Sequence, residues 1–257
     1  MEIITIINQK GGVGKTTIAT NVAYSLAQRR KRTLIIDLDP QAHSTLLFMG
    51  NPPQHYIQDC LSGSCSIVNA AYKAIDAKGP VDNLEILPSS IKLAVVAEQV
   101  SGRVHREKIL SRLLKLFKQN PPFDFDYVII DCPPTLGVLA LNGICAANKY
   151  IIPIDSSRYA IEGMKDLLAV ISEAKEDEPY KYIIVKNKYD SRTSVTNNYI
   201  DEILFKEFLK NVAKTSIRRL EAINQSQING EPIFSFDAKS KASEDFNALT
   251  EEVLNWR

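Results

Sequence analysis

A glycine-rich loop that ends in Gly-Lys-Thr-Thr restricts the fold of this chain more than any other feature. The loop spans residues 10–17, between a β-branched run at 2–7 and a stretch at 16–30 whose apolar residues recur at helical spacing. Glycines let the backbone approach a polyphosphate without a Cβ clash, and the following helix adds the positive end of its dipole. A strand, a loop and a helix in this order predict a phosphate site in an α/β fold.

The residues of this loop have distinct expected roles. Lys15 is placed to reach the β- and γ-phosphates of ATP, and the Thr16 hydroxyl to coordinate Mg²⁺. The other loop residues expected to bind the nucleotide are Gly11, Gly12, Val13, Gly14 and Thr17. The loop departs from the general P-loop pattern, because Gln9 stands where a glycine is the rule and a second lysine, Lys10, follows it. The alternative is a glycine-rich turn with incidental lysines, and the position between strand and helix argues against it.

Three aspartates are expected beside the loop. Asp37 and Asp39 follow one apolar run, and Asp131 ends another. In an open parallel sheet, ligands bind at the carboxyl ends of the strands, where carboxylates suit Mg²⁺ and an attacking water. We therefore expect Mg²⁺ and an attacking water beside these three carboxylates, with Thr16, Asp37 and Asp131 as the candidate metal ligands. A capping or turn role is the alternative for any single aspartate.

Strand-like and helix-like segments alternate along the whole chain. Strand-like runs lie at 2–7, 33–36, 84–87, 127–130, 150–154 and 182–185. Helical periodicity is found at 16–30, 106–117, 138–147, 161–174 and 198–210. Continuous apolar strands separated by helices predict a P-loop NTPase-like α/β fold, with a mostly parallel sheet covered by helices on both faces. We expect a single domain over 1–257, in which 51–79 forms short helices over one edge of the sheet.

Composition narrows the class of protein without naming a partner. The chain has 257 residues, 45% of them hydrophobic, which is enough for one large core. Its 31 Lys and Arg nearly balance 30 Asp and Glu, so the overall charge predicts no partner. The spacing of the four cysteines does not fit a metal site and favours free thiols in a reducing cytosol. No run approaches the roughly 20 apolar residues that cross a bilayer, so we expect a cytoplasmic protein.

With these motifs the chain resembles the ParA/MinD group of deviant Walker ATPases over nearly its whole length. The matching segments are the phosphate loop 10–17, Asp-Leu-Asp-Pro-Gln at 37–41, Ile-Ile-Asp-Cys-Pro-Pro at 129–134 and the stretch 141–163. The resemblance implies an ATP-sandwich homodimer in which Lys10 contacts phosphates held by the other subunit. It implies that Asp39 orients the attacking water and that Asp131 holds Mg²⁺ through water, with Lys10, Lys15 and Asp39 as catalytic residues. One departure is His43, where the group commonly has Asn.

Within this group, the C-terminal half resembles ParA partition proteins. Tyr-Asp-Ser-Arg-Thr at 189–193 is similar to their Tyr-Asp-x-Arg-Thr signature, and Asn187 lies near the position that holds adenine in those proteins. Ile-Arg-Arg at 217–219 stands where they have Ile-Pro-Arg. The second Arg and the Glu-Ala usual in that loop are missing. The resemblance therefore implies Asn187 as a nucleotide contact and leaves the details of the base-binding loop and the DNA contacts open.

Local charge favours DNA as a partner. From 181 to 219 the chain carries nine basic and four acidic residues, a net charge of +5. Such a patch suits sequence-independent binding to double-stranded DNA, which weakens as salt rises. We predict Arg192, Arg218 and Arg219 as DNA contacts. A solvated helix face is the alternative for the lysines within 206–214.

We expect a DNA partition ATPase that binds nonspecific DNA as an ATP dimer, associates with the nucleoid and is released by a ParB-type partner. A MinD-like membrane regulator is one alternative. The acidic segment 250–257 lacks the lysine-rich face of a membrane-surface helix, so we expect no stable membrane attachment. We expect Trp256 to be a core plug or an end-cap. A metabolic or assembly ATPase is the second alternative. Cys132 and Cys145 do not match the paired interface cysteines usual in that class.

Overall fold

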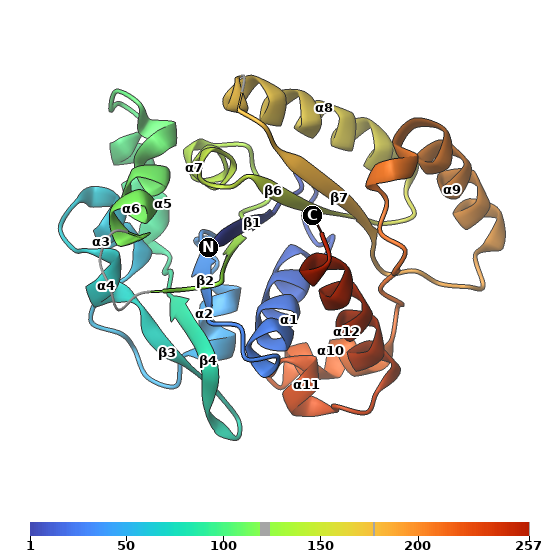
Figure 1. Cartoon of the computed structure of the whole chain (residues 1–257), viewed down its shortest axis with the longest axis horizontal. Coiled ribbons are helices and arrows are strands. Elements are labelled where there is room, and N and C mark those ends of the chain that lie inside the picture. The colour runs from blue at the N-terminus through green and yellow to red at the C-terminus, as the bar shows by residue number, and fades with distance from the viewer. Residues whose placement is uncertain (119–123, 177, 257) are drawn as a thin grey trace.

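The computed structural model describes residues 1–118, 124–176 and 178–256, and these ranges contain a seven-stranded sheet between two layers of helices (Figure 1). The strands are β1 (Glu2–Ile6), β2 (Thr33–Asp37), β3 (Tyr72–Asp76), β4 (Gly79–Leu87), β5 (Tyr127–Asp131), β6 (Lys149–Ile154) and β7 (Lys181–Lys186). Their order is β3-β4-β2-β5-β1-β6-β7, and β3 pairs antiparallel with β4 whereas the other neighbours are parallel. The predicted P-loop NTPase-like α/β fold is confirmed.

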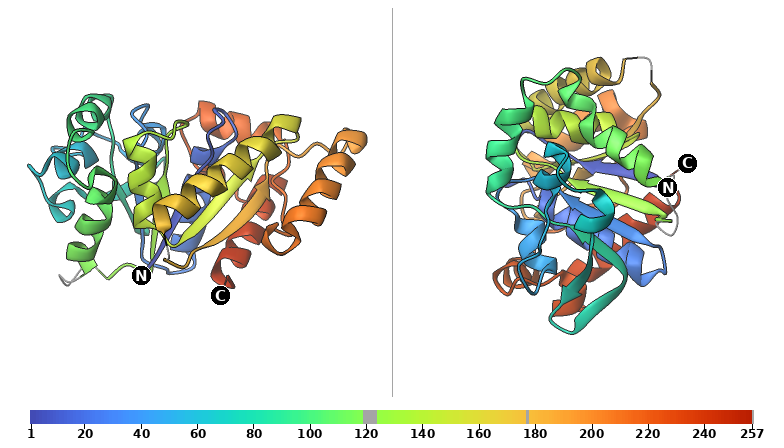
Figure 2. Two further views of the ribbon diagram at one scale, coloured as in Figure 1. Left: turned by 90° about the horizontal axis from the view of Figure 1, so that it is seen from above. Right: turned by 90° about the vertical axis from the view of Figure 1, so that its left-hand side faces the viewer.

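The helices divide between the two faces of the sheet, as Figures 1 and 2 show. One layer contains α1 (Lys15–Gln28), α2 (His43–Phe48), α10 (Glu221–Ile228), α11 (Ile233–Phe236) and α12 (Lys241–Leu254). The other contains α3 (Ile57–Ser62), α4 (Ile67–Ala70), α5 (Lys92–Val100), α6 (Ile109–Lys118), α7 (Val138–Ala146), α8 (Arg158–Lys175) and α9 (Ser194–Phe208). Short 3₁₀ turns, η1 (Arg106–Lys108) and η2 (Leu209–Asn211), precede α6 and follow α9.

The strands are buried on both faces because successive side chains alternate between two cores. Ile4 and Ile6 of β1, with Ile35 of β2, pack in the core under α1 and α12. Leu34 and Ile36 of β2 pack in the opposite core, under α3 to α9. All five side chains are fully buried, and each contributes about 1.5–3 kcal/mol relative to an exposed position. This two-sided burial explains why the strands read as continuous apolar runs.

The central strands end at the same level of the sheet. β1 lies between β5 and β6, and β2 lies on the far side of β5. In the two parallel registers, both Ile6 and Asp37 are opposite Asp131. The loop that follows β1 therefore opens beside both aspartates, and the carboxyl edge of the sheet becomes the place for a ligand.

The segment 51–79 contains more than the predicted short helices. It holds α3 and α4, but also the edge strand β3 and the turn into β4. The apolar pattern does not reveal β3, because only Ala74 of its five residues is buried. β4 begins at Gly79, before the predicted start at residue 84, because its first residues pair with β3 in an antiparallel hairpin. Here the sequence-based expectation is incomplete.

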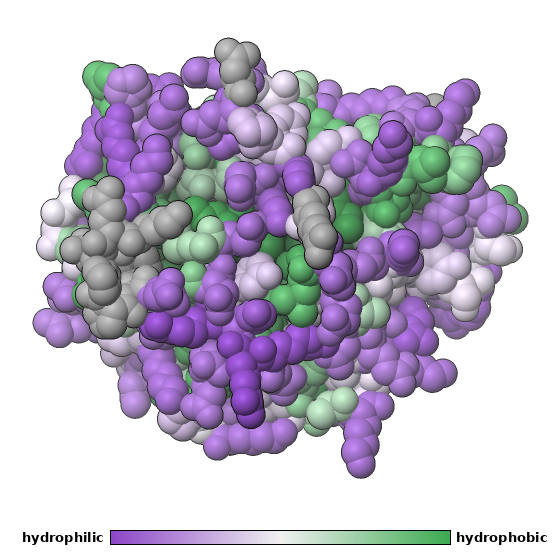
Figure 3. Space-filling model, viewed as in Figure 1, coloured by the Kyte–Doolittle hydropathy of each residue, from purple (hydrophilic) through white to green (hydrophobic). Residues whose placement is uncertain are grey.

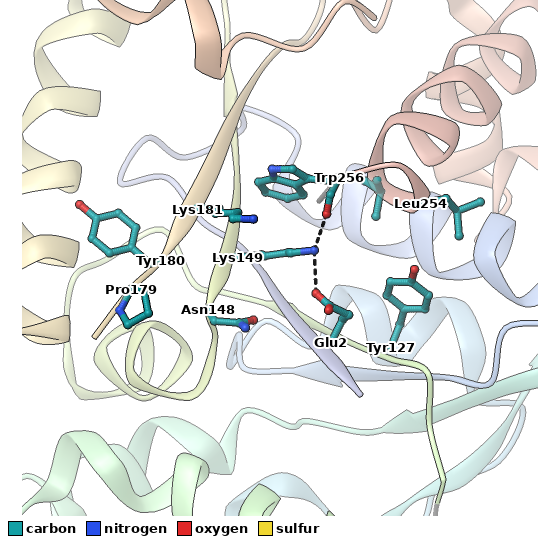
Figure 4. A pocket seen from close by; sticks show the side chains of 10 residues that line it. Glu2, Tyr127, Asn148, Lys149, Pro179, Tyr180, Lys181, Leu254 and Trp256 are labelled. Atoms are coloured by element: carbon teal, nitrogen blue, oxygen red, sulfur yellow. Dashed lines mark hydrogen bonds and ion pairs between the residues drawn. The ribbon is translucent and has the colours of Figure 1, made fainter. Parts of the chain in front are cut away.

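The C-terminal end of α12 is fastened to the amino ends of the strands. The Lys149 ammonium donates a hydrogen bond to the Trp256 carbonyl at 2.6 Å and forms an ion pair with Glu2 at 2.7 Å (Figure 4). It also lies 5.5 Å from the centre of the Trp256 ring. These groups border a cavity of about 460 Å³, to which Tyr180 and Lys181 also contribute. Trp256 thus caps the end of the fold, and Arg257 lies outside the described residues.

Among the described residues, no helix has the length and apolar character that a bilayer-crossing segment requires. On the face shown in Figure 3, hydrophilic side chains dominate, and hydrophobic surface appears in separate areas between them.

Candidate active site

The loop between β1 and α1 has a backbone that requires glycine. Gly12 has a φ of 70° and Gly14 a φ of 95°, both in the left-handed region. Behind the loop, Asn187, which follows β7, donates from Nδ2 to the carbonyl of Val13 at 2.7 Å. A Cβ on Gly14 would lie only 2.0 Å from the same Nδ2. Asn187 therefore supports the loop from the far side of β6.

The start of α1 is prepared to receive an anion. Gly14 is its N-cap, no side chain caps it, and the first turn holds no acidic residue. The N–H groups of that turn are thus available at the positive end of the helix dipole. Lys15 is only 6% exposed, and its ammonium donates to the Lys10 carbonyl at 3.1 Å, across the loop. Burial lowers the pKa of Lys15, and the charge of Asp131 acts against this.

Asp37 is fixed by three hydrogen bonds at the end of β2. Its Oδ2 accepts from both the backbone N–H and the hydroxyl of Thr45, each at 2.8 Å. Its Oδ1 accepts from the backbone N–H of Asp39 at 3.1 Å. Burial raises the pKa of Asp37, and the neighbouring charge of Asp131 raises it further. Asp37 thus holds the turn that carries Asp39.

Asp131 has one bound oxygen and one unpartnered oxygen. Its Oδ2 accepts from the Ser44 hydroxyl at 2.7 Å, whereas its buried Oδ1 has no hydrogen-bond partner among the described residues. Burial raises the pKa of Asp131, and the hydroxyls of Ser44 and Thr16 act against this. A buried carboxylate oxygen without a donor is costly unless another group satisfies it.

Asp39 lies at the mouth of the site rather than in the core. Its Oδ1 accepts from the backbone N–H of Gln41 at 2.9 Å, and its carbonyl accepts from the Ser89 hydroxyl at 2.8 Å. Its side chain borders a cavity of about 620 Å³ that also contacts Gly11, Gly12, Gly14 and Lys15 to Thr17. The structure therefore brings the predicted phosphate loop and Asp39 to one cavity.

The same cavity has a second wall that the sequence analysis did not identify. It is formed by Leu220, the N-cap of α10, and by Ile223, Asn224 and Gln227 of that helix. Gln227 donates from Nε2 to the Thr17 hydroxyl at 2.5 Å, which joins α10 to the phosphate loop. Their spacing of three and four residues is typical of one helix face and could have indicated the wall.

Cations and amide groups surround this cavity. Lys15, Lys188, Arg218 and Arg219 contribute positive charge, and Asn187 borders the cavity at the end nearest β7. This arrangement suits a ligand with several negative charges and a polar base. The predicted role of Asn187 as a nucleotide contact stays a prediction, beside its observed bond to Val13.

Lys10 points away from this cavity. Its ammonium forms an ion pair with Asp155 at 2.5 Å and donates to the Ser157 hydroxyl at 3.1 Å. Asp155 follows β6, and Ser157 is the N-cap of α8. Burial by itself raises the pKa of Asp155, but the bonds from Lys10 and Ser157 outweigh it and lower the pKa. Lys10 is therefore held on its own subunit and is not a ligand of its own loop.

The three arginines predicted to contact DNA lie in two adjacent segments, since Tyr189 and Arg218 form a parallel bridge. Arg218 is committed within the chain: it forms an ion pair with Asp245 of α12 at 2.7 Å. Arg192 is 85% exposed and pairs with Asp190, whose pKa its hydrogen bonds lower to about 2. Arg219 is exposed, and among the described residues no ion pair holds its side chain.

The donor set fits Mg²⁺ bound together with a polyphosphate. Among the described residues, no group of three His, Cys, Asp or Glu side chains could hold a metal alone. Mg²⁺ characteristically uses one or two carboxylates, water and substrate phosphates instead. The unpartnered oxygen of Asp131 and the Thr16 hydroxyl beside it provide protein ligands of that kind.

Comparisons with known proteins identify the family to which this chain belongs. The family described as "AAA domain" matches residues 1–184. The sporulation initiation inhibitor protein Soj of Bacillus subtilis is 34% identical, over 98% of each chain. The chromosome partitioning protein ParA of Myxococcus xanthus is 32% identical, over 98% of this chain and 87% of its own. Among solved structures, cobyrinic acid a,c-diamide synthase of Mycobacterium smegmatis with ADP and magnesium matches with a TM-score of 0.80 at 28% identity, covering 99% of this chain and 94% of its own.

Proposed function

The chain belongs to the ParA/Soj family of P-loop ATPases, and from this premise we propose that it is a DNA partition ATPase. It binds ATP with Mg²⁺, forms an ATP-bound homodimer and holds nonspecific double-stranded DNA in that state. A ParB-type partner stimulates hydrolysis and releases the dimer from the nucleoid. The chain acts as a single ATPase domain over 1–257.

One observation carries the ATPase part of the proposal. The uncapped start of α1, the buried Lys15 and the unpartnered oxygen of Asp131 lie together at the carboxyl edge of the sheet. The first two suit phosphates, and the third suits a cation that accompanies them. A structural turn requires none of these features.

The residues of the site then have separate tasks. The loop N–H groups and Lys15 bind the phosphates, and Thr16 and Asp131 hold the metal. Asp37, predicted as a third metal ligand, instead positions the turn that carries Asp39, because both its oxygens accept hydrogen bonds within the chain. When bound, Mg²⁺ neutralises charge on the β- and γ-phosphates. Asp39, at the mouth of the cavity, orients the attacking water.

The dimer is proposed to depend on Lys10. Its exposed side chain reaches the β6–α8 side of its own subunit, where Asp155 and Ser157 hold it. In the ATP-bound dimer Lys10 leaves these partners and contacts the phosphates of the other subunit. A cation supplied in trans stabilises charge that develops during phosphoryl transfer.

The DNA surface is proposed to involve Arg192 and Arg219. Both are exposed, Arg219 at the cavity and Arg192 on the neighbouring segment that follows β7. Arg218 instead fastens this region to α12 through Asp245, so its effect on DNA is expected to be indirect. A dimer doubles the number of such cations, which links DNA affinity to ATP binding.

A membrane role receives less support from the C-terminal helix. Phe246, Leu249 and Val253 of α12 are buried in the core under the sheet. Its apolar face is thus occupied within the fold, and a membrane-surface helix needs that face for lipid.

ATP turnover tests the enzymatic part. We expect Asp39→Ala to lower kcat by about 100-fold or more, because it removes the group that orients water, while ATP affinity is retained. The readout is phosphate release together with ATP binding in the same preparation. If the variant hydrolyses ATP as fast as the parent chain, Asp39 does not have this role.

A further inference from the structure

A hydroxyl in the first turn of α2 reaches the end of β5. Ser44 is fully buried, and its Oγ donates to Oδ2 of Asp131 at 2.7 Å. Asp131 is itself fully buried, so its carboxylate is held by neighbouring protein groups rather than by bulk solvent. The two residues are 87 positions apart in sequence, and neither belongs to the other's motif.

The orientation of Asp131 needs such a donor. The last torsion of an aspartate side chain is broad and roughly two-fold, so packing alone fixes the carboxylate weakly. With Oδ2 bound to Ser44, Oδ1 is the oxygen that stays without a partner among the described residues. We propose that Ser44 is a positioning residue that holds the Asp131 carboxylate with one oxygen free for the cation site. This inference rests on the proposed ATPase function.

α2 is a firm base for this bond. The next residue, Thr45, donates its N–H and its hydroxyl to Asp37, each at 2.8 Å. Thr45 Oγ1 also accepts from the N–H of Ser89 at 2.8 Å, beyond the end of β4. The first turn of α2 is thus tied to β2, β4 and β5 at once, and Ser44 has little freedom to move away from Asp131.

Groups that orient a metal ligand commonly change metal affinity by 10- to 100-fold when they are removed. Ser44→Ala should therefore reduce the gain in affinity that Mg²⁺ gives to a nonhydrolysable ATP analogue. The measurement is the dissociation constant of the full chain for the analogue, in Mg²⁺ and in EDTA, by calorimetry. We expect the ratio of the two constants to fall about tenfold, with the EDTA value unchanged.

Ser235→Ala is the matched control. Ser235 is also a buried serine, but its Oγ has no hydrogen-bond partner among the described residues, and it lies in α11, outside the cavity lining. Its substitution should leave both constants unchanged. Ser44→Cys keeps a weak donor of similar shape and should give an intermediate ratio, which also serves if Ser44→Ala does not fold.

The outcomes separate the inference from the proposed function. A parent chain that responds to Mg²⁺ and a Ser44→Ala variant with the same ratio would overturn the positioning role. An equal loss in Mg²⁺ and in EDTA would also overturn it, because Ser44 would then only support the fold. A parent chain that binds no analogue in either condition would overturn the proposed function and, with it, the premise of this inference.

Discussion

Asn187 occupies the space that a side chain on Gly14 would need, since its Nδ2 lies 2.0 Å from the Cβ position of that glycine. The same nitrogen donates to the carbonyl of Val13, so Asn187, the residue after β7, fixes the position of the phosphate-loop backbone. The loop is therefore shaped by two segments that are 174 positions apart, and not by its glycines alone.

Gly14→Ala should destabilise the chain through both strain and overlap. A left-handed backbone costs a non-glycine residue about 1–2 kcal/mol, and forced overlap in a packed site about 1–3 kcal/mol. Urea unfolding without nucleotide should show a lower midpoint. Gly11→Ala is the control, because a Cβ there meets nothing within 4 Å and the φ is not positive. Adding Asn187→Ala to Gly14→Ala should restore only the part of the lost stability that is due to overlap. If the urea midpoint of the double variant does not rise above that of Gly14→Ala, the account is contradicted.

The ion pair between Lys10 and Asp155 should stabilise the chain above the ordinary aspartate pKa. The folded pKa of Asp155 is lowered, so its contribution is present above the unfolded value of about 3.9 and is lost as pH falls through the folded value. The difference in unfolding free energy between the parent and Asp155→Asn should be constant from pH 8 to about 5 and shrink below about 4. Urea unfolding across this range measures it. A difference that does not change with pH would show that the pair contributes nothing.

Lys149→Met should loosen the C-terminal end of α12. The substitution keeps much of the side-chain volume but removes the donor to the Trp256 carbonyl and the partner of Glu2. We expect a loss of about 0.5–1.5 kcal/mol, because the half-buried Trp256 carbonyl loses its donor and the partly exposed Glu2 carboxylate loses its partner. Lys181→Met on the same cavity wall is the control, since no ion pair among the described residues involves Lys181. Thermal unfolding of both variants measures the loss. An equal drop in Tm for Lys149→Met and Lys181→Met would contradict the stabilising role of the Lys149 contacts.

The sequence predicts those parts of the site that lie within one local motif. The strand, the glycines and Lys15 are adjacent in the chain, and Asp37 and Asp131 each end an apolar run, so periodicity and spacing identify them. The parallel direction of the strands also follows the expected pattern, apart from β3 at the edge, whereas the order of the strands is not predicted. These features depend on residues that are close together in the chain, so they can be predicted from a single sequence.

The remaining contacts join distant segments, and only packing brings them together. Gln227 reaches Thr17 across 210 positions, and Lys10 reaches Asp155 across 145. Neither pair has a fixed spacing or a residue type that marks it. Arg218 shows the same effect in reverse: its charge suggests a DNA contact, but the fold gives it a partner in α12.

DNA binding by the hydrolysis-blocked chain tests the central claim most directly. Asp39→Ala protein would be offered random duplex DNA and anionic liposomes across a salt series, with ATP and without it. We predict binding to DNA only with ATP, weakening steeply as salt rises, and a shallower salt dependence when Arg219→Ala is added. Binding to liposomes instead of DNA, or DNA binding that does not require ATP, would contradict the account.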